Sequence, residues 1–143
     1  MDAYTTEARV RAQFNLHSTD RLSAESVDTA IADAHVAIAR VLDPAVDVSG
    51  ETVDHLPRGL VLGATLLAGA RLFEALAAAE AFDQQRVALG PQRIEESTRR
   101  RDLLAAAGVA EARAWRALEP FVTQPAAREH ATVTASQAVL GED

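Results

Sequence analysis

The chain has 143 residues, which is enough for a single domain with one hydrophobic core. Hydrophobic residues make up 48% of it and aromatic residues only 4%, so we expect helices that pack through small side chains and depend on interfaces for stability. The absence of cysteine excludes a disulfide framework, a thiolate metal site and a cysteine nucleophile. The net charge is −7, and residues 1–83 carry six arginines against 13 acidic residues. A basic nucleic-acid footprint is therefore absent over most of the chain.

The first expected helix begins after Thr5 or Thr6, either of which can cap it, and runs to about Phe14. A second helix is expected to follow Ser23, a good N-cap, and to end before Pro44. Its apolar residues recur at spacings of three and four and form one stripe: Val27, Ile31, Ala34, Ile38 and Val41.

The third expected helix, from Leu56 to Phe82, has almost no polar face. Its run from Gly59 to Ala70 carries no charge and is too short to span a bilayer, so we expect a core helix and no membrane segment. A helix that is apolar all round must be buried all round, and a chain this short offers few other helices to cover it. We therefore expect other copies of the chain to cover part of it. The expected subunit-interface residues are Leu60, Gly63, Leu67, Phe73 and Trp115.

Two glycines one turn apart on this helix, Gly59 and Gly63, are expected to let a neighbouring backbone come close. After Phe82 the helical pattern dissolves, and Gly90-Pro91 predicts a turn between short segments. A fourth helix is expected to begin at Ser97 or Thr98, to be kinked or divided at Gly108, and to end at Pro120.

The chain after the fourth helix shows no helical stripe. Residues 120–143 form either a disordered terminus or a docking arm that becomes ordered on a partner, and residues 1–119 form the helical domain. The arm carries scattered apolar residues that we expect to make the docking contacts: Phe121, Val133, Val139 and Leu140. The predicted class is all-α, a small bundle of about four helices with an extended C-terminal arm.

No sequence motif indicates catalysis. None of the four histidines has the spacing of helical metal ligands, and His35, beside Asp28 and Asp33, is interpreted as a helix flank or a subunit contact. There is no nucleophile elbow, phosphate loop or dinucleotide fingerprint. We assign no catalytic, cofactor-binding or metal-binding residue and expect no cofactor.

Arg99, Arg100 and Arg101 form a basic cluster in an otherwise acidic chain. They can contact DNA phosphates, or they can pair with the acidic loop of a neighbouring subunit. The sequence leaves both interpretations open.

Several segments together resemble the head–tail connector (adaptor) proteins of tailed bacteriophages and gene transfer agents. The similarity lies in the opening Tyr4–Phe14, the Thr19–Ser23 turn, the acid-dotted helix Val27–Leu42 and the Leu56–Leu60 start of the apolar helix. It covers residues 4–82 in pattern, and the later stretch Ile94–Val122, which contains Trp115–Phe121, resembles the family's last helix.

The resemblance implies a structural subunit of the virion neck, assembled in the host cytoplasm. Such subunits form a ring, expected to be a dodecamer, beneath the portal protein, extend the channel for double-stranded DNA, and bind the next neck or tail component, a stopper or tail terminator. The C-terminal segment is expected to reach the portal. An acidic channel also suits DNA that must slide without sticking.

Two other classes of protein remain open at this stage. One is a small helical binding or regulatory protein, a dimer that buries the third helix in a four-helix core. The other is an enzyme with a carboxylate site or a site at His35, although no sequence motif supports this class.

Overall fold

The computed structural model describes residues 3–16, 22–50, 52–86 and 91–123. Every secondary-structure element within these ranges is a helix, which confirms the all-α class. The elements in chain order are α1 (Glu7–Gln13), α2 (Ala24–Ala39), the 3-10 helix η1 (Val53–His55), α3 (Arg58–Arg86), α4 (Pro91–Leu118) and the 3-10 helix η2 (Glu119–Phe121). Val133, Val139 and Leu140 of the expected arm lie outside the described residues.

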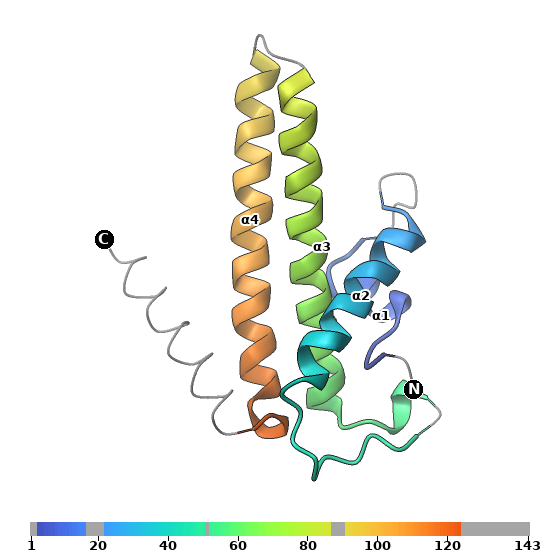
Figure 1. Ribbon diagram of the computed structural model, residues 1–143. Helices are drawn as coiled ribbons and strands as arrows, with labels where there is room; N and C mark the ends of the chain where they lie inside the picture. The colour runs from blue at the N-terminus through green and yellow to red at the C-terminus, as the bar shows by residue number, and fades with distance from the viewer. Residues whose placement is uncertain (1–2, 17–21, 51, 87–90, 124–143) are drawn as a thin grey trace, which may run out of the picture.

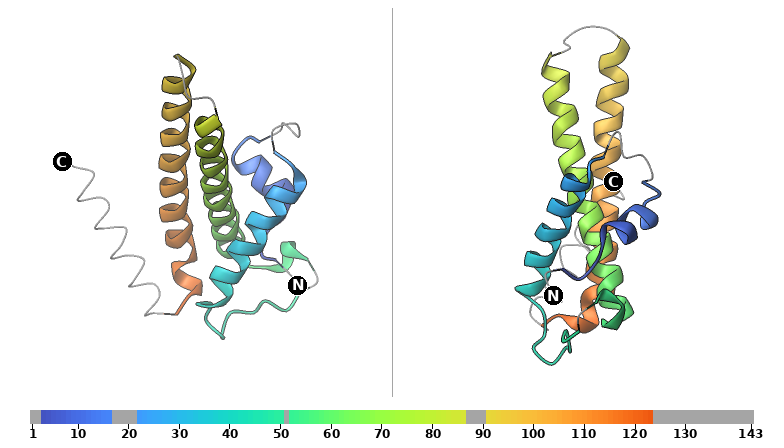
Figure 2. Two further views of the ribbon diagram at one scale, coloured as in Figure 1. Left: turned by 45° about the horizontal axis from the view of Figure 1, so that its top comes forward. Right: turned by 90° about the vertical axis from the view of Figure 1, so that its right-hand side faces the viewer.

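Helices α3 and α4 form a long antiparallel hairpin, and α1 and α2 lie against only one end of it (Figure 1). That end holds the first half of α3 and the second half of α4. The other half of the hairpin projects beyond α1 and α2, as the turned views in Figure 2 also show. The molecule is thus a four-helix body from which a two-helix extension projects.

Helix α1 is defined by local hydrogen bonds at both of its ends. The Thr6 side chain accepts from the backbone N–H of Arg9, as an N-cap does. At the other end Asn15 has a left-handed φ of 56°, and the Leu16 N–H donates to the Arg11 carbonyl at 2.8 Å. This is a Schellman-type ending with asparagine in the position that glycine usually takes.

Helix α2 follows its predicted cap and apolar stripe. The Ser23 side chain accepts from the Ser26 N–H at 3.2 Å. The residues that α2 buries lie on one face: Val27, Ala30, Ile31, Ala34 and Ile38. Arg11 links α1 to the segment just before α2, because its guanidinium donates to the Leu22 carbonyl at 2.8 Å while it pairs with Glu7 of its own helix at 2.9 Å.

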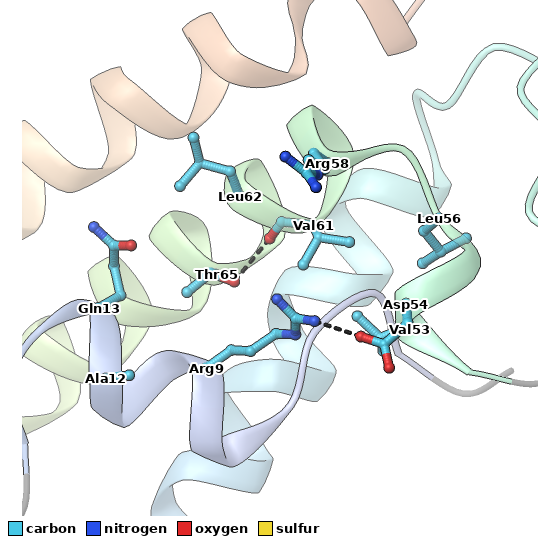
Figure 3. A pocket seen from close by; sticks show the side chains of 10 residues that line it. All are labelled: Arg9, Ala12, Gln13, Val53, Asp54, Leu56, Arg58, Val61, Leu62 and Thr65. Carbon is cyan, nitrogen blue, oxygen red and sulfur yellow. Dashed lines mark hydrogen bonds and ion pairs between the residues drawn. The ribbon is translucent and has the colours of Figure 1, made fainter.

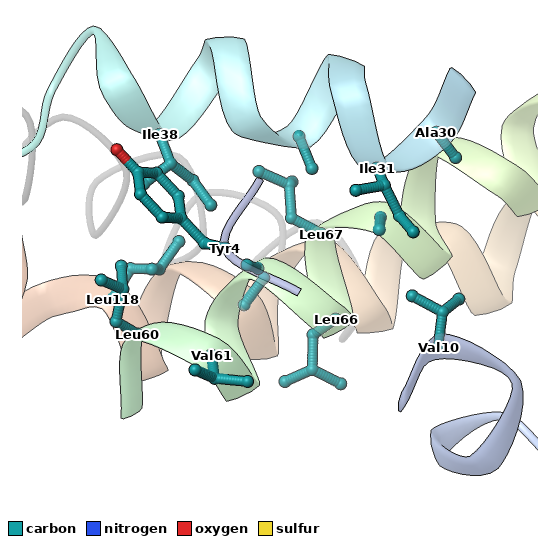
Figure 4. Packing of buried hydrophobic residues seen from close by; sticks show 14 of the residues in the cluster. Tyr4, Val10, Ala30, Ile31, Ile38, Leu60, Val61, Leu66, Leu67 and Leu118 are labelled. Carbon is teal, nitrogen blue, oxygen red and sulfur yellow. The ribbon is translucent and has the colours of Figure 1, made fainter. Parts of the chain in front are cut away.

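The apolar first half of α3 is covered by the chain's own elements. From Leu60 to Ala70 every residue is buried except Leu62, whose exposed fraction is 42%. Figure 4 shows Leu67 directed toward Ile31 and Ile38 of α2 and Leu60 beside Leu118 of α4. No other copy of the chain is needed to bury this stretch, which corrects the expectation drawn from its sequence.

Glycines of α3 make this cover possible, as expected for Gly59 and Gly63. A Cβ built on Gly59 would lie 2.7 Å from the Phe121 ring, and one on Gly63 would collide with Leu118. A Cβ on Gly69 would collide with the Phe14 ring. Small residues at these positions therefore let α4 and the end of α1 come close to the α3 backbone.

Both long helices are longer than the sequence predicted, so the connection between them is shorter. Helix α3 continues to Arg86, and α4 begins at Pro91 and runs unbroken through Gly108. Half of the 14 residues 83–96 are Gln, Arg or Glu, which are good helix formers but form no apolar stripe. Proline suits the first position of a helix, so Pro91 begins α4 rather than ending the helical region.

The helical body ends four residues beyond the predicted boundary at residue 119. Phe121 packs against the core, Val122 is 3% exposed, and Val122 forms an antiparallel bridge with Leu42. The Thr123 N–H donates to the Val41 carbonyl at 2.8 Å. The structure thus places Phe121 in the body, and any arm begins after Thr123.

Two glycines offer a matched test of the packing on α3. A Cβ at Gly108 meets nothing within 4 Å, so Gly108→Ala should raise the free energy of unfolding by about 0.5–1 kcal/mol through helix propensity alone. Gly63→Ala gains the same propensity but must displace Leu118, and overpacking of a core costs about 1–3 kcal/mol. Urea denaturation should therefore show opposite signs for the two variants. A Gly63→Ala variant as stable as Gly108→Ala would contradict the close contact between α3 and α4.

Two truncations test where the body ends. A chain that ends at Pro120 loses the packing of Phe121 and Val122, and burial of each such side chain contributes about 1.5–3 kcal/mol. We expect its thermal midpoint to lie clearly below that of a chain that ends at Thr123, which keeps both side chains. Equal midpoints would place the end of the body at residue 120.

Candidate interaction surfaces

Most of the residues predicted to lie at a subunit interface lie inside the chain. Leu60 and Leu67 are 0% exposed, and Gly63 is buried under α4. Trp115 is 9% exposed, and Phe73 is half-buried with its ring edge against Phe14, the centroids 5.2 Å apart. These side chains belong to the chain's own core, because α1, α2 and α4 together cover α3.

An exposed apolar surface lies instead on α4. Leu104 is 45% exposed and Val109 is 60% exposed, and three small residues adjoin them at helical spacings of three and four. We call this surface the α4 stripe; it consists of Leu104, Ala105, Gly108, Val109 and Ala112. It runs from the projecting part of the hairpin toward the body.

The α4 stripe has the character of a helix-packing surface. Small residues let another helix approach closely, and the flanking leucine and valine provide apolar area to bury. Gly108 has nothing within 4 Å of a built Cβ, so its side of α4 is open to a partner. Large exposed aliphatic residues that gather on one helix face commonly mark an interface.

The basic cluster lies on the described part of α4 nearest the hairpin tip. Arg99, Arg100 and Arg101 are exposed and precede the α4 stripe by one turn. Their arrangement still fits both the DNA-phosphate and the neighbouring-subunit interpretation. Elsewhere on the hairpin, Arg71 of α3 pairs with Glu74 at 3.4 Å and with Glu111 of α4 at 3.6 Å, which links the two long helices.

His35 packs against an aromatic ring. Its ring centroid lies 4.4 Å from that of Tyr4 at an interplanar angle of 47°. Its Nδ1 is buried and has no hydrogen-bond partner among the described residues. Burial raises the pKa of the Tyr4 hydroxyl, which therefore stays neutral at physiological pH. This pair has the features of packing side chains at the edge of the core.

Within the described ranges no three histidine, aspartate or glutamate residues come together as metal ligands would. The acidic loop after α2 is held by its own turns. Asp47 accepts from the Ser49 N–H at 2.9 Å and from the Ser49 hydroxyl, and these hydrogen bonds lower the pKa of Asp47.

A hollow of about 670 Å³ opens between α1, η1 and the start of α3 (Figure 3). Its polar side chains come from α1, η1 and the first turn of α3, and Arg9 pairs with Asp54 at 2.6 Å. Its apolar side chains come from α1, from η1 and the residue that follows it, and from α3. The full lining is Arg9, Ala12, Gln13, Val53, Asp54, Leu56, Arg58, Val61, Leu62 and Thr65.

The floor of the hollow is fixed by a buried hydroxyl pair. Thr65 is 4% exposed, and its hydroxyl lies 2.7 Å from that of Thr5 and 2.7 Å from the Val61 carbonyl. Because Thr65 has one hydroxyl proton and Val61 offers only an acceptor, Thr5 donates to Thr65, which donates to Val61. This chain of hydrogen bonds holds the segment before α1 against α3.

Among the described residues, one helix is long and apolar enough to cross a membrane by length and composition alone. It is the Arg58–Ala79 part of α3, whose mean hydropathy over the relevant window is 1.6. Of that window 67% is buried inside the molecule, as in the core helix of a folded domain. The apolar stretch is thus longer than the uncharged run that the sequence analysis considered, but its burial fits the core helix expected there.

Comparisons with protein-family models, with curated proteins and with solved structures found no match to this chain.

Sequence reasoning missed both surfaces for physical reasons. The α4 stripe is made mostly of Ala and Gly, so it gives little signal beside the stronger buried face of the same helix. The hollow joins α1 to η1 and the start of α3, which begin about 40 residues further along the chain. A signal for the stripe existed in the i, i+4 recurrence of Leu104, Gly108 and Ala112, which the predicted break at Gly108 obscured.

The α4 stripe predicts self-association that depends on two residues. Leu104→Glu combined with Val109→Glu should abolish association in analytical ultracentrifugation, because burial of two carboxylates in an apolar interface is strongly unfavourable. Both side chains are exposed in the single chain, so the thermal midpoint should change little. Ala32→Glu with Val36→Glu, exposed on α2 and equal in charge change, is the control. Unchanged association in the stripe variant would rule this surface out as the interface.

Proposed function

We propose that the protein is a structural head–tail adaptor that forms a ring beneath a portal, extends the DNA channel and connects the head to the neck or tail. The observation that carries the proposal is the unpartnered α4 stripe on a hairpin that projects from a self-sufficient body. A body that buries its own core and exposes an apolar face on a long helix is suited to side-by-side assembly. The resemblance of residues 4–82 and 94–122 to adaptor proteins supports the same function.

Ring assembly would use the α4 stripe of one copy and a different surface of the next. A heterologous contact of this kind closes into a ring when the rotation that relates neighbouring copies is a whole fraction of a full turn. A rotation of about 30° between neighbours would give a ring of about twelve copies. The acidic balance of the chain, −7 overall, suits a channel wall that repels DNA phosphates. The partners in this proposal are other copies of the chain, the portal protein, a stopper or tail terminator, and DNA in passage.

The α4 stripe also suits the alternative of a dimeric helical binding protein, in which two hairpins pair into a four-helix bundle. The two proposals differ in closure: an isologous contact stops at two copies, whereas a heterologous contact continues to a ring. The ring is favoured here because it also accounts for the family resemblance.

Native mass spectrometry of the chain, alone and mixed with a candidate portal ring, tests the proposal. We expect a ring of about twelve copies or a complex with the portal in fixed stoichiometry. The Leu104→Glu/Val109→Glu variant should lose the ring, and the Ala32→Glu/Val36→Glu control should keep it. A stable dimer that ignores the portal would contradict the adaptor function and favour the helical regulator.

A further inference from the structure

We propose that the hollow between α1, η1 and α3 binds residues 139–143 of the same chain, folded back onto the body. These residues are Val-Leu-Gly-Glu-Asp, two apolar side chains followed by two carboxylates. The inference concerns the free chain and does not depend on the proposed ring.

The hollow has an apolar floor that is partly open. Leu56 and Val61 are largely covered, but Leu62 is 42% exposed at its edge, although it lies in the most apolar part of α3. An apolar side chain placed here would cover Leu62 and complete the burial of that stretch. The floor is therefore suited to bind a ligand that has an aliphatic part.

The rim of the hollow is positive on a chain that is otherwise acidic. Arg9 is compensated by Asp54, which lies 2.6 Å away. Arg58 also lines the hollow, is exposed, and makes no ion pair within the described part of the chain. The two arginines and one carboxylate leave a net positive charge at the rim, so the ligand's polar part should be anionic.

Residues 139–143 match both requirements. Val139 and Leu140 provide the aliphatic part, and Glu142 and Asp143 provide two carboxylates with no basic residue between them. The part of the chain between Thr123 and Val139 carries one arginine and one glutamate and offers no such combination. Arg58 and the acidic pair are thus complementary in charge.

The body holds the start of this segment at the same end of the molecule as the hollow. The Phe121 ring lies against Gly59, the residue next to Arg58, and Thr123 is bonded to Val41. The 16 residues from Gln124 to Val139 can extend about 50 Å, more than the roughly 43 Å length of α3. Tethering of this kind gives effective concentrations in the millimolar range, which favours the same chain over a second copy as the occupant.

The cysteine-free sequence allows a direct test by disulfide trapping. The variant Gln13→Cys/Ala138→Cys places one thiol on the hollow and one beside the proposed ligand. We expect its intramolecular disulfide to form at least about tenfold faster than that of Arg113→Cys/Ala138→Cys, whose first thiol lies on the exposed face of α4. Ala12→Cys, also on the hollow, replaces Gln13→Cys if circular dichroism shows that the latter disturbs α1.

Charge reversal separates specific binding from general proximity. Arg58→Glu in the trapping variant should slow disulfide formation about tenfold, and Arg116→Glu, which changes the net charge equally, should not. Equal rates for the two cysteine pairs, a covalent dimer as the main product, or no effect of Arg58→Glu would each overturn the proposal. Native mass spectrometry of the same variants measures ring formation independently of disulfide trapping. The failure of this proposal and the failure of the adaptor function are therefore distinguishable.

Discussion

The structure depends on the close packing of bulky side chains against glycines of α3. Leu118 lies over Gly63, the Phe121 ring over Gly59, and the Phe14 ring over Gly69. These contacts bring the end of α4, the residues after it and the end of α1 to the backbone of one helix. With α2 on the remaining side, the first half of α3 is covered by one chain. The second half of α3 lies beyond α1 and α2 and has α4 as its helical neighbour (Figure 1).

This division determines which surfaces are available for function. The body offers the hollow between α1, η1 and α3, and the described part of α4 offers the α4 stripe on its outer face. The proposed adaptor function uses the stripe for contact between copies. The proposed binding of residues 139–143 uses the hollow and concerns the free chain. If the C-terminal segment also reaches the portal, it must first leave the hollow, so portal binding and release of the segment would be coupled equilibria.

The sequence predicted the local features of the fold well and the long-range features poorly. The caps at Thr6 and Ser23, the stripe on α2 and the close approach at Gly59 and Gly63 follow from a few neighbouring residues, and the structure has all of them. The start of α4 was misplaced because residues 84–96 carry no apolar periodicity, although their propensities allow a helix. The interface residues Leu60, Gly63 and Leu67 were misplaced for another reason. An all-apolar helix demands burial, but its own sequence cannot say whether the cover comes from the same chain or from another copy.

Hydrogen exchange on the free chain tests the central claim that one chain buries the first half of α3. The amides of residues 60–70 should be strongly protected at concentrations where the chain is monomeric, and their protection should not change on dilution. The double variant Leu104→Glu/Val109→Glu should show the same protection, because its changes lie on the exposed face of α4. Protection that falls as the chain is diluted, or that is lost in this variant, would mean that other copies cover α3 and would contradict the account.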